Sequence, residues 1–302
     1  MSEATATLDT LSKAQGMATF AMYHKALALA QTGDFDGAEA LFERPESAAI
    51  HGLRRGVLAQ VQVLSQLDRG PDAIALIDFV YRGAPDAGMA DLRERLAQGE
   101  KIPFDVARTP QDGMAEAYFS LATLLVGQPN DTLTLLNARI AAALRPDHVE
   151  AVLMSARLFD KLGQYDLAQS TFAQVPQGDP AYVSAIIGQA SSAQMAGKPQ
   201  EAAALLKGLA GKNPDNAGVL SAYGDSLRRL DRCDAAIGVY SQAIALIKTA
   251  VPADWALFYR RGGCRQAQGD WPRAEADYKL ALSLAPGEPR ILNELGYSYV
   301  DR

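Results

Sequence analysis

The prolines of this chain recur at a fixed distance. Pro146, Pro180 and Pro214 are separated by 34 residues each, and Pro286 follows after one more such period and a unit of 38. Small residues keep the same spacing, in the series Ala156, Ala190, Gly224, Gly262, Gly296 and in the series Ala168, Ala202, Ala236, Ala274. A period of this length is typical of a repeat protein. The sequence therefore predicts a tandem array of similar units.

Each unit carries the pattern of two helices. In residues 255–288, small and apolar residues at helical spacing precede a break at Gly269-Asp270, and the helical spacing resumes after Pro272. Proline fits the first turn of a helix, where its missing N–H is not needed. Alanine and glycine let the two helices approach closely, and a large residue such as Tyr240 or Tyr278 fills the gap beside them. A hairpin with so little bulk must stack on its neighbours to bury its apolar face.

These residues resemble a known family. The unit with Phe258, Gly262, Tyr278, Ala281 and Pro286, followed by "LGYSY", is similar to the tetratricopeptide repeat. The resemblance implies an all-α fold, a right-handed superhelix (α-solenoid) of antiparallel helix-turn-helix units. It also implies a concave groove, lined by the first helices, that binds a protein or peptide partner.

The repeats divide the chain into three predicted regions. Residues 1–101 resemble degenerate helical hairpins, residues 102–114 are expected to be a linker, and residues 115–302 form the regular array. Its units are expected to start near residues 115, 149, 183, 217, 255 and 289. The last unit has only its first helix, which indicates a fragment of a longer protein. Its uncovered apolar face is a candidate for homo-oligomer formation.

Composition and motifs exclude several classes of function. The net charge of −6 opposes nucleic-acid binding, and no apolar run is long enough to span a membrane. His24, His51 and His148 lie in different units without a motif, so we expect them to be surface or packing residues. No metal or cofactor site and no catalytic constellation is predicted, and the chain is not expected to be an enzyme.

The two cysteines allow two interpretations. Cys233 lies at the turn of its unit and Cys264 lies late in the first helix of the next, and these places are neighbours in an antiparallel stack. A disulfide is one hypothesis, which requires Cα atoms within about 7 Å. The alternative is that both are small buried side chains with free thiols.

The family resemblance places a set of residues in the groove. Arginine and tyrosine are the residue types that most often anchor interfaces. "SLRRLDR" and "FYRRG" bring Arg228, Arg229, Arg260 and Arg261 to one stretch, which favours an acidic or extended peptide. The alternative is that the arginines pair with Asp225, Asp231 and Asp254 or are simply solvated. The predicted groove residues are Phe119, Arg157, Lys161, Gln194, Asp225, Arg228, Arg229, Tyr259, Arg260, Gln266, Asn293 and Tyr297.

A narrower resemblance concerns location. "PADWALFYRRG" followed by "NELGYSYVDR" is similar to a group of exported alphaproteobacterial repeat proteins of poorly defined function. It implies a periplasmic or envelope-associated scaffold, with a cytoplasmic location as the alternative. The alternative function is a ligand-sensing or enzyme-associated module that binds a small anion or a lipid through the arginines.

Overall fold

The computed structural model describes residues 2–300 and is built from helices that pack as sequential pairs. This confirms the predicted all-α fold of helix-turn-helix repeats. The chain divides into two compact units: residues up to 162 with residues 175–181, and residues 163–174 with residues 182 onward. Within residues 2–300, no helix has both the length and the apolar character needed to cross a bilayer.

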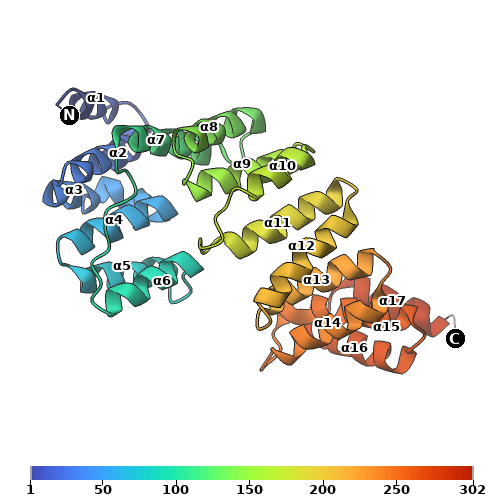
Figure 1. Ribbon diagram of the computed structural model, residues 1–302. Coiled ribbons are helices and arrows are strands. Elements are labelled where there is room, and N and C mark those ends of the chain that lie inside the picture. Colours follow the sequence, from blue (N-terminus) through green and yellow to red (C-terminus); the bar gives the residue numbers. More distant parts are fainter. Residues whose placement is uncertain (1, 301–302) are drawn as a thin grey trace. The chain divides into compact units, whose positions relative to one another are not determined.

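The first unit holds helix pairs α2/α3, α4/α5 and α7/α8, each joined by a short turn (Figure 1). Helix α7 also packs against α2, far away in the sequence. The elements of this unit are α1 (Ser2–Leu11), α2 (Ala18–Gln31), α3 (Phe35–Phe42), the 3₁₀ segment η1 (Pro45–Gly52), α4 (Arg54–Gln66), α5 (Gly70–Tyr81), α6 (Ala87–Ala97), α7 (Pro110–Leu125), α8 (Asp131–Leu144) and α9 (Val149–Lys161).

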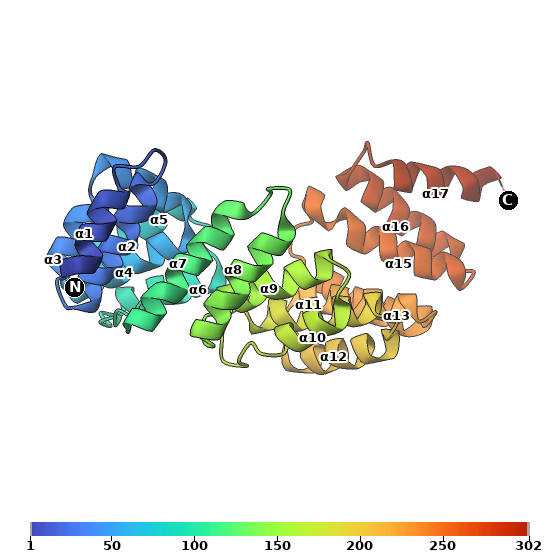
Figure 2. The ribbon, with the colours of Figure 1, turned by 90° about the horizontal axis from the view of Figure 1, so that it is seen from above.

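The second unit is a regular stack, in which each second helix also packs on the first helix of the next pair (Figure 2). The pairs are α11/α12, α13/α14 and α15/α16. The elements are α10 (Tyr165–Phe172), α11 (Tyr182–Met195), α12 (Pro199–Lys212), α13 (Ala217–Arg229), α14 (Cys233–Ala245), the 3₁₀ segment η2 (Pro252–Asp254), α15 (Trp255–Ala267), α16 (Trp271–Leu284) and α17 (Pro289–Val300).

The turns inside these pairs need a left-handed backbone. Gly197 and Gly269 supply it between α11 and α12 and between α15 and α16, with φ of 75° and 78°. Between α13 and α14 the same role falls to Asp231, with φ of 57°. Aspartate tolerates this conformation better than most residues with a side chain. The repeated break in the sequence is therefore a repeated backbone geometry.

An aromatic ring lies directly on a glycine in the last two complete pairs. A Cβ atom added to Gly224 would lie 2.5 Å from the Tyr240 ring, and one added to Gly262 would lie 2.9 Å from the Tyr278 ring. Both tyrosines are almost fully buried. The rings therefore have little room to move away, and the two helices of each pair can meet this closely only with glycine at the crossing.

The predicted linker is largely ordered by packing on α4. Ile102 donates its N–H to Ser65 Oγ at 2.8 Å, and Asp105 donates its N–H to Gln62 Oε1 at 2.9 Å. Ile102 and Val106 are buried. We call residues 102–109 the strap.

The prediction that residues 110–114 belong to the linker is wrong, because they form the first turn of α7. The Thr109 side chain accepts a hydrogen bond from the Asp112 N–H, and Pro110 occupies the first helical position.

A buried ion pair joins α4 and α7. Arg55 donates from Nε and Nη2 to the two carboxylate oxygens of Glu116, which is fully buried. Tyr23 Oη lies 3.4 Å and His148 Nε2 lies 3.1 Å from Glu116 oxygens. Burial alone would raise the pKa of Glu116, but the Arg55 charge and His148 lower it to about 2. These contacts explain why α7–α9 belong to the first compact unit.

His24 on α2 is buried without a polar partner for Nε2 among the described residues. Its ring lies between Phe20 and Tyr23, at 4.3 and 5.0 Å between ring centroids. Burial lowers the pKa of His24 from 6.5 to about 4, against a small opposing effect of Glu116. The folded protein therefore holds this histidine neutral, as a packing residue.

Because an aromatic ring packs against the glycine at the helix crossing, we predict opposite effects of two Gly→Ala variants on the free energy of unfolding. Gly224→Ala should lower the free energy of unfolding by about 1–3 kcal/mol, because the added methyl group overlaps the buried Tyr240 ring. Gly238→Ala, at an exposed site of α14 with no neighbour within 4 Å, should raise it by about 0.5–1 kcal/mol. Urea denaturation of both variants measures the difference. Equal effects would contradict the account.

The neutral state of His24 predicts a loss of stability in mild acid. The unfolded chain binds a proton near pH 6.5 and the folded chain only near pH 4. The contribution of the neutral His24 side chain to the free energy of unfolding is therefore complete above pH 6.5. It is lost as the pH falls through 4, at a cost of about 3 kcal/mol. Urea denaturation at pH 7, 5.5 and 4 should show a flatter pH profile for His24→Gln than for the parent. An equal slope in His24→Gln and the parent would refute the assignment.

Candidate functional site

The first helices of the last repeats share one polar surface in the second unit. Arg260 Nη1 on α15 forms an ion pair with Asp225 Oδ2 on α13 at 3.0 Å, and Gln266 Nε2 on α15 donates to Glu294 Oε1 on α17 at 2.9 Å. These contacts connect α15 to both neighbouring first helices. We call this surface the first-helix face. Its side chains are those of Ser221, Asp225, Arg228, Tyr259, Arg260, Gln266, Asn293, Glu294 and Tyr297.

Aromatic rings continue this face. Tyr259 lies 5.8 Å from the ring centroid of Trp255 and 5.8 Å from that of Tyr278. The Arg290 guanidinium lies over the Trp255 ring at 4.8 Å. Burial, and then the charge of Glu294, raises the pKa of Tyr259. The Tyr259 hydroxyl is therefore a neutral group that can donate a hydrogen bond to a ligand.

The predicted groove residues are distributed over both compact units. Gln194, Asp225, Arg228, Arg229, Tyr259, Arg260, Gln266, Asn293 and Tyr297 belong to the second unit, whereas Phe119, Arg157 and Lys161 belong to the first. The structure brings Asp225 and Arg260 into direct contact. Tyr297 is 66% exposed, and Asn293 beside it is exposed as well. Arg157 is exposed, and Lys161 pairs with Asp131 at 2.7 Å.

The prediction that Phe119 is an exposed groove residue is wrong. Phe119 is 8% exposed, and its ring lies 4.6 Å from that of His148 between ring centroids. The cause is the packing of α7 against α2 and of the Phe119 ring against His148, contacts that the repeat pattern does not contain. This side chain is part of the core of the first unit.

Two of the four neighbouring arginines already have carboxylate partners. Arg260 pairs with Asp225, as the alternative interpretation expected. Arg261 turns instead to α16, where it and Arg265 pair with the buried Asp277 at 2.7 and 2.8 Å. The arginines therefore do not form one free cationic cluster.

Several residues of the face were not found from the sequence. Glu294 could have been found, because it lies one 34-residue period after Arg260. The repeat pattern predicts only a space-filling role for Tyr240 and Tyr278, although their hydroxyl groups reach the first-helix face. Tyr240 donates to Asp225 at 2.7 Å and Tyr278 donates to Gln266 at 2.8 Å. The signal was that both are tyrosines, whereas the equivalent Phe172 has no hydroxyl group.

The two cysteines border this region. Cys233 at the start of α14 and Cys264 in α15 form a disulfide, with Cα atoms 5.0 Å apart. The bond connects the α13/α14 pair to α15, one helical turn from Arg260. Of the two hypotheses drawn from the sequence, the structure contains the disulfide.

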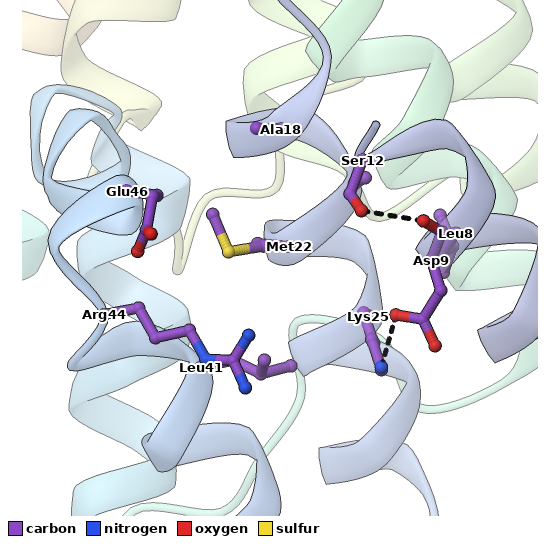
Figure 3. A pocket seen from close by; sticks show the side chains of 10 residues that line it. Leu8, Asp9, Ser12, Ala18, Met22, Lys25, Leu41, Arg44 and Glu46 are labelled. Atoms are coloured by element: carbon purple, nitrogen blue, oxygen red, sulfur yellow. Dashed lines mark hydrogen bonds and ion pairs between the residues drawn. The ribbon is translucent and has the colours of Figure 1, made fainter. Parts of the chain in front are cut away.

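A hollow lies in the first unit between α1, α2, α3 and η1 (Figure 3). Its volume is about 200 Å³, with Met22 and Leu41 on its apolar wall. Lys25 at the rim pairs with Asp9 at 2.5 Å. Its lining carries two cations and two anions without a convergent set of catalytic groups. Within residues 2–300, no three His, Cys, Asp or Glu side chains are grouped as metal ligands.

Comparisons with known proteins agree with this architecture. Profiles described as tetratricopeptide repeat match residues 2–49 and 187–250, and another with the same description matches residues 150–180. A search of curated proteins finds no significant match.

Solved structures of repeat proteins are also similar. MamA (41-end) from Desulfovibrio magneticus RS-1 has a TM-score of 0.50 at 15% identity, covering 60% of this chain and 99% of that one. A tetratricopeptide repeat protein from Parabacteroides merdae has a TM-score of 0.44 at 16% identity and covers 92% of this chain and 97% of that one. YrrB, described as having an unusual peptide-binding site, has a TM-score of 0.46 at 15% identity, covering 60% and 92%. The matching profiles, the repeat spacing and the paired helices agree that the chain contains tetratricopeptide repeats, over residues 2–49, 150–180 and 187–250.

Proposed function

We propose that the chain is a non-catalytic interaction scaffold, which binds an extended segment of a partner protein along the first-helix face. Tetratricopeptide repeats imply protein–protein interaction. The observation that carries the proposal is the composition of this face: Arg228, Tyr259 and Tyr297 are exposed or half-exposed beside side chains already held in place. Arginine and tyrosine on a rigid support are the residues that most often dominate binding energy.

The first unit supports the proposal less well. Helix α4 lies at the centre of that unit, and the strap runs along it with hydrogen bonds to Gln62 and Ser65. That surface of α4 is therefore occupied by the chain itself. A partner segment finds accessible polar and aromatic groups on the second unit instead.

The arrangement of the arginines favours a protein partner over a small anion. Arg260 and Arg261 each pair with a different carboxylate, Asp225 and Asp277, so these two guanidinium groups do not form a single cationic cluster that would hold a small anion. A protein segment can instead use separate contacts spread over α13, α15 and α17. The acidic net charge of the chain gives no support to nucleic-acid binding.

Affinity capture from the native cell tests the proposal. A variant with Arg228→Ala, Tyr259→Ala and Tyr297→Ala should retain its partner at least tenfold more weakly than the parent, because each anchor contributes more than about 1 kcal/mol. The matched control carries Gln242→Ala, Lys248→Ala and Lys279→Ala, which are exposed residues away from the first helices. Thermal denaturation first establishes that all three proteins are folded. A partner retained equally by all three would place the interaction elsewhere.

We also propose that the chain acts in an oxidising compartment such as the bacterial envelope. The disulfide supports this proposal, since such bonds persist mainly in secreted and periplasmic proteins. The resemblance to exported repeat proteins points the same way. The envelope is where a partner should first be sought.

We expect removal of the disulfide to lower the stability of the fold. It closes a loop with a sequence separation of 31, so replacing both cysteines by alanine should lower the free energy of unfolding by about 3–4 kcal/mol. Non-reducing mass mapping of protein from the native cell should find the Cys233–Cys264 linkage. Two free thiols in that sample would remove both the bond and its support for an oxidising compartment.

A further inference from the structure

Two buried tyrosines reach from second helices to the first-helix face. The Tyr240 hydroxyl on α14 donates to Asp225 Oδ1 at 2.7 Å, and the Tyr278 hydroxyl on α16 donates to Gln266 Oε1 at 2.8 Å. Their rings are fixed, because they lie on Gly224 and Gly262 inside their helix pairs. The rigid core therefore fixes the position of each hydroxyl group at the first-helix face.

Each hydroxyl begins a chain of two polar contacts. Asp225 accepts a hydrogen bond from Tyr240 with one oxygen and forms an ion pair with Arg260 Nη1 through the other, at 3.0 Å. Gln266 accepts from Tyr278 and donates to Glu294 at 2.9 Å. The first chain ends on a cation of α15 and the second on an anion of α17. The buried tyrosines thus orient two opposite charges on neighbouring first helices.

The hydroxyl groups are not required by the fold. Phe172 and Leu206 occupy the equivalent positions of the two preceding repeats, 68 and 34 residues before Tyr240, and both are buried. An apolar side chain of suitable size therefore satisfies this position. Hydroxyl groups occur where the first helix of the same pair offers Asp225 or Gln266 as an acceptor.

Both tyrosines remain protonated in neutral solution. Burial raises the pKa of Tyr240, and the neighbouring Asp225 carboxylate raises it further. Burial and then Glu294 raise the pKa of Tyr278. Each phenol hydroxyl therefore keeps its proton and acts as a hydrogen-bond donor. The side-chain oxygen of Asp225 or Gln266 that accepts this bond must face the hydroxyl.

We propose that Tyr240 and Tyr278 are positioning residues that hold Arg260 and Glu294 for a partner segment with an acidic side chain opposite Arg260 and a basic side chain opposite Glu294. Guanidinium carries donors on three nitrogen atoms, and Arg260 uses Nη1 for Asp225 and Ser221, so Nε and Nη2 can donate to a carboxylate. Glu294 binds Gln266 through Oε1, so Oε2 can accept from a lysine or arginine. This inference rests on the proposed function and names the charge pattern of the partner.

Arginine side-chain NMR tests the positioning role without a ligand. In Tyr240→Phe, Asp225 loses its fixed donor, and the order parameter of the Arg260 Nε–H group should fall below about 0.6, the range of a flexible group. Arg261 in the same helix is the internal control, because it is held by Asp277 and should not change. An unchanged Arg260 would overturn the role of Tyr240. A loss of order in both arginines would reveal general loosening and would also overturn it.

Peptide binding tests the partner's charge pattern. A phage-displayed library of random dodecapeptides is selected on the full chain, and enriched peptides are synthesised for fluorescence anisotropy. They should carry both an acidic and a basic residue, and Tyr240→Phe should weaken their binding about tenfold. In an Asp225→Ala background, Tyr240→Phe should have no further effect, because the hydroxyl acts through Asp225. A merely structural tyrosine would weaken binding in both backgrounds.

The outcomes separate the two proposals. Enriched peptides that bind Tyr240→Phe as tightly as the parent overturn the positioning role alone. Enriched peptides without charged residues overturn the charge pattern. A library that yields no binding peptide contradicts the proposed function, while the NMR measurement still decides whether the tyrosine orients Arg260.

Discussion

The second unit depends on the contact between a buried aromatic ring and a glycine at the helix crossing. Gly224 and Gly262 leave the space that Tyr240 and Tyr278 fill, so the two helices of a pair are fixed at a short distance. Protein interiors tolerate neither a void nor an overlap at such a place. Because each pair also packs on the next, the same contact positions the first helices whose side chains form the candidate binding face.

The first unit is held together differently. Its central feature is an ion pair between Arg55 and the buried Glu116, surrounded by Tyr23 and His148. A buried charge is stable only when it is paired and hydrogen-bonded, so these residues determine which helices can meet there. The strap adds a second non-repeating feature by covering α4 with an extended segment. Repeat-like helices thus serve as a closed core in one unit and present an accessible face in the other.

The helix pairs could be predicted from the sequence because their determinants are local and periodic. Glycine or alanine at the crossing, one large residue and a turn recur at the same spacing, and each acts within one pair or on the next. The burial of Phe119 could not be predicted, because it follows from contacts of α7 with distant parts of the chain.

In the candidate site, too, the periodic features could be predicted from the sequence and the contacts between side chains could not. The positions of Asp225, Arg260 and Asn293 on first helices follow from the period, but the partners of their side chains do not. Arg260 and Arg261 are adjacent in sequence, yet one pairs with Asp225 on α13 and the other with Asp277 on α16. Adjacent residues on a helix point in directions about 100° apart, so two neighbouring arginines need not serve one surface.

Hydrogen–deuterium exchange of the full chain, with and without its captured partner, tests most directly whether the first-helix face is the binding surface. The account predicts slower exchange in α13, α15 and α17 on binding, with α12, the strap and α4 unchanged. Protection confined to the first unit, or to the second helices of the pairs, would contradict it.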